Sequence, residues 1–216
     1  MVFIALHGST GEDGSIQGML DVLGVSYTGS GVLGCATSLD KSISKSILQD
    51  NNLPVIKGIN LPNKISFENA KKLINKFGFP CILKPINEGS SIDVYALDSE
   101  LNINNNINNN KFINNFEKKQ WMLERRVIGR EFAVGIINNK ALPIVEIIPK
   151  SGLYDYKAKY ISGDTQYVCP ANLTDDTSKT IQEMAVKAFN YLKCDSWGRV
   201  DFLMDDQGIY ILEVNT

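Results

Sequence analysis

Residues 199–216 read RVDFLMDDQGIYILEVNT, and this stretch decides the fold. Two apolar runs flank a turn sequence rich in Asp and Gly, so the stretch predicts a β-hairpin. With a loop over residues 206–208, Asp201 lies opposite Glu213, and Asn215 points the same way because strand side chains repeat every second residue. Facing carboxylates destabilise a sheet, whereas two carboxylates and an amide oxygen suit Mg²⁺ that also holds phosphate oxygens. The hairpin therefore predicts a magnesium site made of Asp201, Glu213 and Asn215.

Composition limits the class of protein. The chain has 216 residues, 44% of them hydrophobic and 21% charged, as in ordinary globular domains. A net charge of -2 gives no field that favours nucleic acid or anionic lipid. No apolar run approaches the length of a membrane span, and residues 1–7 lack the basic start of a signal peptide. We therefore expect a cytoplasmic protein with no nucleic-acid or membrane partner.

Cysteine and histidine usage excludes several metal and redox sites. The four cysteines are widely separated, without the spacing of a zinc site or a CxxC motif. The single histidine, His7, excludes a zinc centre built on histidines. We expect four ordinary, mostly buried thiols in a reducing compartment.

The order of predicted elements indicates an α+β fold. Strands and helices alternate early in the chain, and antiparallel hairpins dominate late. The predicted strands before the closing hairpin cover residues 2–6, 81–84, 121–124, 131–137 and 141–148. The predicted helices include residues 38–50, 66–77 and 177–192. The first strand has no obvious sheet partner, so we expect the front of a domain to be missing.

Two phosphate-binding motifs can be set aside. No GxxxxGK[ST] string is present. Residues 29–34 match GxGxxG, but the segment before them is short and half polar, so a connecting loop is the better interpretation.

Weaker signals are spread along the chain. Lys84 ends a buried strand, where it could reach a phosphate or simply be solvated. Residues 88–91, Glu-Gly-Ser-Ser, could cradle a phosphate or form an ordinary turn. Glu124 ends another strand, where it could accept from a purine or ribose or be exposed. Residues 154–160 form a loop dense in Tyr and Lys, as lids often are.

Together these strings resemble the ATP-grasp enzymes and, among them, the D-alanine–D-alanine ligase family. The resemblance covers essentially the whole chain, in the family's order and close to its spacing. The matching strings are residues 5–8, 11–14, 27–31, 40–41, 84–85, 88–91, 154–156, 159–160, 199–201 and 213–216.

The resemblance implies a fold, a domain division and a reaction. Two α+β subdomains would grip ATP, over residues 40–125 and 126–216, preceded by a remnant of an α/β N-terminal domain over residues 1–39. The family phosphorylates the carboxylate of one D-alanine with ATP; the amine of a second D-alanine then attacks the acyl phosphate. The product serves peptidoglycan precursor synthesis, and full-length homologues are expected to be homodimers.

The resemblance also implies residue roles toward ATP. Lys41 and Lys84 would contact its phosphates, and Lys159 the γ-phosphate. Glu124 and Glu131 would contact its adenine and ribose.

Further roles concern the metals and the amino acids. Arg199 would hold the tetrahedral intermediate, and His7 would lie near the first D-alanine. Ser90 and Tyr160 would belong to a hydrogen-bonded set beside that substrate. Two Mg²⁺ ions, replaceable by Mn²⁺, would be held by Asp201, Glu213 and Asn215.

The family pattern extends beyond both ends of the chain. A preceding strand with a substrate-binding glutamate and a following Pro-Gly loop with a last helix are absent from the 216 residues. We therefore expect a fragment that is poorly stable and inactive as a ligase on its own.

Three alternatives remain open. The chain could be another ATP-grasp carboxylate–amine ligase, a non-catalytic ATP-binding remnant, or a structural module without nucleotide binding. A substrate panel and nucleotide calorimetry separate them.

Overall fold

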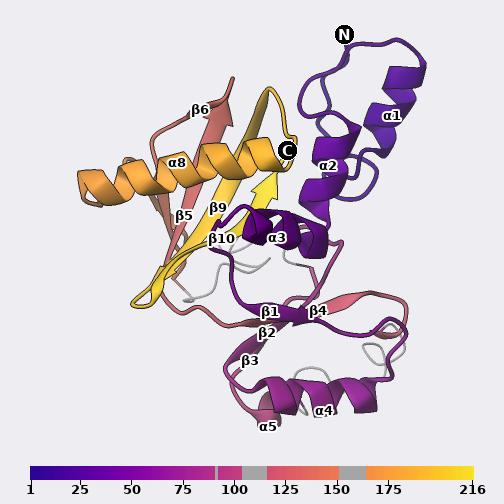
Figure 1. The fold of residues 1–216 in the computed structure, drawn as a ribbon, viewed down its shortest axis with the longest axis vertical. Helices are drawn as coiled ribbons and strands as arrows, with labels where there is room; N and C mark the ends of the chain where they lie inside the picture. The colour runs from indigo at the N-terminus through magenta and orange to yellow at the C-terminus, as the bar shows by residue number, and fades with distance from the viewer. Residues whose placement is uncertain (91, 104–115, 151–163) are drawn as a thin grey trace. The chain divides into compact units, whose positions relative to one another are not determined.

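The computed structural model describes residues 1–90, 92–103, 116–150 and 164–216 (Figure 1). Their contacts form two compact units: unit 1 is Met1–Val55 with Ile128–Thr216, and unit 2 is Ile56–Val127. Each unit has a sheet and a hydrophobic core of its own. Within the described ranges, every helix is too short or too polar to cross a membrane.

Unit 1 combines helices with an antiparallel sheet. Its strands follow the order β10-β9-β5-β7-β8, and β6 pairs with β5. The helices are α1 (Ser15–Val22), α2 (Val32–Leu39), α3 (Lys41–Asp50) and α8 (Asp175–Tyr191). The strands are β5 (Arg130–Ile137), β6 (Lys140–Ala141), β7 (Val145–Ile148), β8 (Gln166–Val168), β9 (Trp197–Asp205) and β10 (Gly208–Asn215).

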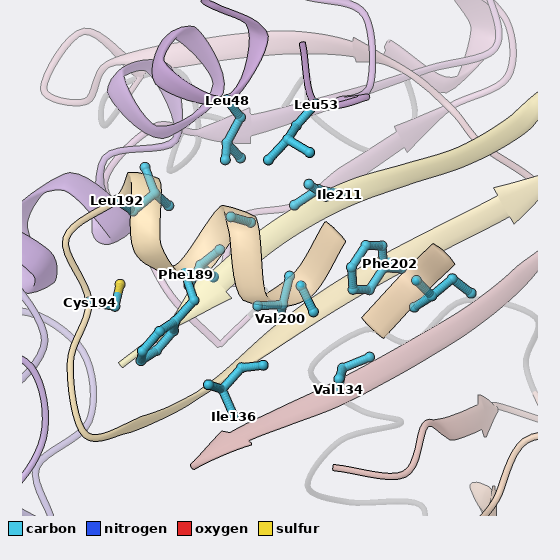
Figure 2. Close-up of a cluster of buried hydrophobic side chains, with 14 of the residues drawn as sticks. Leu48, Leu53, Val134, Ile136, Phe189, Leu192, Cys194, Val200, Phe202 and Ile211 are labelled. Carbon is cyan, nitrogen blue, oxygen red and sulfur yellow. The ribbon is translucent and has the colours of Figure 1, made fainter. Parts of the chain in front are cut away.

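The core of unit 1 lies between α8 and one face of this sheet (Figure 2). Phe189 comes from α8, Val134 from β5, and Val200 and Phe202 from β9; all are buried. These strand residues alternate with Asp201 and Ala133, so the sheet has a core face and an opposite face. The polar residues predicted for the metal site belong to the opposite face.

The closing hairpin pairs Glu213 with Asp201, as predicted, but its loop is shorter than predicted and its second strand contains a bulge. Gly208 pairs with Asp205, so the loop holds two residues rather than three. A register shift between Ile211 and Glu213 then makes Leu212 an extra residue, and Glu213 comes opposite Asp201. The bulge also keeps both Ile211 and Val214 in the core.

Two predicted elements at the start of the chain are wrong. Residues 2–6 were expected to form a buried strand, but Val2 makes only an isolated bridge to Tyr27 in the described structure, and Phe3 is 70% exposed. The helix predicted over residues 38–50 breaks at Asp40, whose carboxylate accepts from the backbone of Ser42 and Ile43 at 2.9 Å each. Aspartate favours such capping over a helix interior, so one helix ends and another begins there.

Unit 2 is a helix packed on a smaller antiparallel sheet. Its strand order is β1-β4-β2-β3, and its core includes Ile74, Leu83 and Phe116. Ser66 caps α4, as the sequence predicts, by accepting from the backbone of Asn69. The elements are β1 (Gly58–Asn60), α4 (Phe67–Phe77), β2 (Cys81–Pro85), β3 (Tyr95–Leu97), α5 (Glu100–Asn102) and β4 (Trp121–Arg125).

The α+β class predicted from the sequence is confirmed. The division at residues 39/40 and 125/126 stays a prediction; in the contact-based units, residues 40–55 group with unit 1.

Candidate active site

Polar side chains gather on the sheet face of unit 1 that lies opposite its core. In register, Glu213 pairs with Asp201, and Asn215 pairs with Arg199. Directly paired residues of an antiparallel sheet point to the same side. The hairpin therefore brings together four of the residues predicted for the site: Arg199, Asp201, Glu213 and Asn215.

Asp201 is the centre of this group. Its side chain is 6% exposed, whereas that of Arg199 is 49% exposed. Arg199 donates to both carboxylate oxygens, from Nε to Oδ1 at 2.7 Å and from Nη2 to Oδ2 at 2.8 Å. The Asn215 amide donates to Oδ2 at 3.1 Å. A buried carboxylate is thus held by a bidentate arginine and an amide, the strong geometry for such a pair.

The donor set of this face fits a hard divalent cation. Two carboxylates and an amide oxygen are ligands that Mg²⁺ uses when phosphate oxygens and waters complete its shell. Within the described residues there is no cluster of three or more His, Cys, Asp or Glu side chains for a metal, so a site here depends on Asn215 and on a ligand's oxygens. A cation that takes Asp201 must also displace at least part of its bonding to Arg199.

Glu131 lies on the same face, one strand away. It pairs with Leu203 of β9, while Ala133 pairs with Asp201. Its side chain therefore shares the side of the sheet on which Asp201 lies. Ala133, which pairs with Asp201, carries only a methyl group on that side.

Lys41 occupies the first turn of α3. The side chain of Asp40 caps this helix, and Lys41 and Lys45 are both buried, at 8% and 7% exposure. The amino end of a helix favours anions. A buried lysine at that end therefore fits a phosphate ligand better than it fits a solvated position on the surface.

His7 lies in the Gly-rich loop near the start of the chain. Its Nδ1 is 3.6 Å from Glu12 Oε1, and its side chain is 85% exposed. Glu12 Oε2 accepts from the backbone of Gly8 at 2.8 Å. Asp13 accepts from the backbone of Thr10, and that bond, with further bonds from Ser15, holds the pKa of Asp13 below its usual value. The carboxylates of Glu12 and Asp13 therefore hold the backbone of this loop in place.

Lys84 and Glu124 form a buried ion pair in unit 2. The Lys84 Nζ–Glu124 Oε2 distance is 2.6 Å, and the two side chains are 6% and 2% exposed. Register explains the contact: Lys84 pairs with Met122 and Ile82 with Glu124, so the two charges are diagonal neighbours on adjacent strands. The solvated alternatives for both residues are therefore wrong.

Ser90 follows β2 in a loop with an unusual backbone. Its φ is 52°, in the left-handed region that side chains avoid, and the backbone N–H of Ile92 donates to Gly89 at 3.1 Å. Lys119 lies beside this loop, bonded to Glu88 and Asp93. The sequence motifs gave no signal for Lys119, because its partners lie more than 25 residues away.

Lys159 and Tyr160 lie outside the described residues. Their predicted roles stay predictions.

Sequence models of one family match nearly the whole chain. The model described as the D-ala D-ala ligase C-terminus matches residues 47–216, and that of the D-ala D-ala ligase N-terminus matches residues 1–30. A D-alanine–D-alanine ligase of Alkalilimnicola ehrlichii is 41% identical over 219 residues, which cover 99% of this chain and 67% of the relative.

Solved structures of similar proteins share the fold. The D-alanine–D-alanine ligase of Coxiella burnetii superposes with a TM-score of 0.79 at 26% identity, covering 99% of this chain and 57% of that one. The Bacillus anthracis enzyme gives 0.79 at 30% identity, covering 99% of this chain and 68% of that one. A second structure of the Bacillus enzyme, complexed with ATP, also gives 0.79 at 30% identity, covering 99% and 67%. The chain thus has the ATP-grasp fold of these ligases and spans between 57% and 68% of their length.

Proposed function

The chain belongs to the D-alanine–D-alanine ligase family, and from this we propose that it serves the ATP-dependent joining of two D-alanines. ATP phosphorylates the carboxylate of the first D-alanine. The amine of the second then attacks the acyl phosphate, and phosphate leaves. The product, D-alanyl-D-alanine, enters peptidoglycan precursor synthesis.

The observation that carries the proposal is the hairpin face of Asp201, Glu213 and Asn215 beside Arg199. An enzyme that transfers a phosphoryl group must neutralise the charge that develops on it. We assign Asp201, Glu213 and Asn215 to the binding of two Mg²⁺ ions, which Mn²⁺ could replace. Bound there, the ions supply electrostatic stabilisation and orientation of the phosphoryl group.

Arg199 is assigned to the oxyanion of the tetrahedral intermediate. Its guanidinium is half-exposed and already oriented by Asp201, so a short movement exchanges one anionic partner for another. This exchange keeps positive charge beside the reacting carboxyl group while Asp201 takes up a cation.

The lysines and glutamates are assigned to the nucleotide. Lys41 and Lys84 bind its phosphates, with Lys159 on the γ-phosphate. Glu124 and Glu131 accept hydrogen bonds from its adenine and ribose. The pair of Lys84 with Glu124 supports this assignment, because each fixes the other's side chain before a ligand arrives.

Three residues are assigned to the first D-alanine. Ser90 and Tyr160 form a hydrogen-bonded set, and His7 lies near this substrate. The hydrogen bond that the backbone N–H of Gly8 donates to Glu12 supports a preformed loop around His7.

A cytoplasmic location and a homodimer complete the proposal. All four cysteines are free thiols, which suits a reducing compartment. The dimer follows the resemblance to full-length homologues, and sedimentation of this chain tests it.

The test measures binding and turnover separately. Calorimetry with Mg²⁺ and a non-hydrolysable ATP analogue reports nucleotide binding, and phosphate release with D-alanine reports ligation. Asp201→Asn should abolish Mg²⁺-dependent binding of the ATP analogue, while Asp206→Asn, an exposed change in the same hairpin, should not.

The outcomes also separate the alternatives. Nucleotide binding without turnover fits a ligase fragment as well as an ATP-binding remnant, and turnover with other amino acids supports a different ATP-grasp ligase. A chain that binds no nucleotide contradicts the proposal.

A further inference from the structure

Lys119 is the meeting point of a charged cluster in unit 2. Its Nζ is 2.8 Å from Glu88 Oε1 and 2.6 Å from Asp93 Oδ2. Tyr95 donates its hydroxyl to the other oxygen of Asp93 at 3.1 Å. One ammonium therefore joins two carboxylates that lie on either side of Ser90 in the sequence.

The backbone that these carboxylates flank is sterically unfavourable. Ser90 and Asp93 have φ values of 52° and 55°, in the left-handed region where side chains are disfavoured. Surrounding contacts must hold such a backbone in place. The link from Glu88 through Lys119 to Asp93 is a contact of this kind.

Lys119 itself is firmly anchored. Its backbone N–H donates to Phe116 at 3.3 Å, and the indole of Trp121 donates to the same carbonyl at 2.8 Å. The rings of Phe116 and Trp121 stack with centroids 4.9 Å apart in the core of unit 2. The ammonium is thus presented to the loop from a rigid base.

The electrostatics agree with a closed cluster. Partial burial acts to lower the pKa of Lys119, but the hydrogen bonds that its ammonium donates to Asp93 and Glu88, together with the charges of these carboxylates, outweigh burial and raise that pKa above its usual value. Burial, with the charge of Asp93, raises the pKa of Tyr95 to about 12. Lys119 stays charged and Tyr95 stays a donor at any physiological pH.

We propose that Lys119 is a positioning residue: it fixes the Gly89 and Ser90 backbone so that their N–H groups bind phosphoryl oxygens of the nucleotide. The inference rests on the proposed function, because the nucleotide is its ligand. It adds to that function a residue outside every motif that identified the family.

The test compares three variants of the full chain. Lys119→Met removes the ammonium but keeps much of the side-chain length, and Lys119→Arg keeps the charge. Lys72→Ala is the matched control, since Lys72 is an exposed lysine on α4 of the same unit. Each is measured by hydrogen exchange of the Gly89 and Ser90 amides, and by calorimetry with a non-hydrolysable ATP analogue and with adenosine.

Lys119→Met should speed exchange at both amides and weaken binding of the ATP analogue, each by about three- to tenfold, the scale of a partly exposed charged hydrogen-bond network. Adenosine affinity should not change, because adenosine has no phosphate. Lys119→Arg should keep most of the slow amide exchange and most of the affinity for the ATP analogue. Lys72→Ala should change neither.

Unchanged exchange in Lys119→Met overturns the inference, as does a loss of adenosine affinity equal to that of the ATP analogue. If the unchanged chain binds neither ligand, the proposed function fails, and the exchange rates alone decide whether Lys119 fixes the loop.

Discussion

Asp201 is bound by two donors that compete with the cation proposed for it. Arg199 donates hydrogen bonds to both carboxylate oxygens of Asp201, and Asn215 donates to one of them. The carboxylate is buried, so it needs a positive partner at all times. In the proposed site Arg199 supplies that partner until a cation binds, so metal binding would include the free-energy cost of moving Arg199.

We expect Arg199→Ala to tighten Mn²⁺ binding by about three- to tenfold, because the cation no longer displaces a partly exposed bidentate pair. Calorimetry or Mn²⁺ resonance titration measures the affinity without relying on activity.

A matched arginine controls for lost charge. Arg130 forms a bidentate pair with Glu146 at 2.7 Å on the core side of the same sheet. Arg130→Ala should leave Mn²⁺ affinity unchanged. Equal effects of the two substitutions would show that net charge, rather than release of Asp201, controls the site.

Removing one member of the buried pair in unit 2 should be costly. Lys84→Met leaves the Glu124 carboxylate buried without its ammonium, so we expect unit 2 to lose about 3–5 kcal/mol of stability. Urea unfolding measures the loss, and adding Glu124→Gln should recover part of it.

The more exposed pair of Lys71 and Glu68 provides the comparison. Their distance is 3.0 Å, but the Glu68 side chain is 78% exposed. Lys71→Met should cost less than about 1 kcal/mol. A loss of the same size at both sites would contradict the buried character of the Lys84 pair.

At the scale of elements, sequence reasoning reached the right register for a partly wrong reason. It placed Glu213 opposite Asp201 by assuming a three-residue loop, whereas a two-residue loop and a bulge at Leu212 give the same pairing. The alternation of apolar and polar residues shows that the pairing register must shift by one residue. It does not show at which residue the shift occurs. The break at Asp40 was missed because neither glycine nor proline marks it; the side chain of Asp40 instead caps the helix that follows.

Deleting Leu212 should therefore preserve the site. Without it, Ile211, Glu213, Val214 and Asn215 alternate regularly between the core and the opposite face, and Glu213 stays opposite Asp201. We expect Mn²⁺ affinity to remain within about threefold and stability to fall by about 1–2 kcal/mol, for a half-buried leucine.

Deletion of Val214 is the control of equal length. It moves Asn215 to the core face while leaving Glu213 opposite Asp201, so Mn²⁺ binding should be lost. If both deletions abolish binding, the bulge itself shapes the site and the register argument is wrong.

At the scale of the whole molecule, the sequence predicted the class and the family, while the grouping of segments needed the structure. Leu48 and Leu53 pack in the core of unit 1 with Phe202, although residues 56–127 intervene in the chain. The pairing of Lys84 with Glu124 was hidden for the same reason: each was noticed alone, and only strand register joins them. Long-range contacts of this kind leave no local pattern.

Because the two units have separate hydrophobic cores, a core substitution in one unit should destabilise mainly that unit. Ile74 and Ile136 are each fully buried, in unit 2 and unit 1 respectively. Ile74→Ala should cost about 2–5 kcal/mol and speed hydrogen exchange mainly within residues 56–127. Ile136→Ala should act on residues 1–55 and 128–216. Exchange measured by mass spectrometry on both variants tests this. If either substitution speeds exchange equally in the two sets, the chain unfolds as one cooperative whole, and damage to the residues of unit 2 that are proposed to bind the nucleotide would also disturb the hairpin of unit 1.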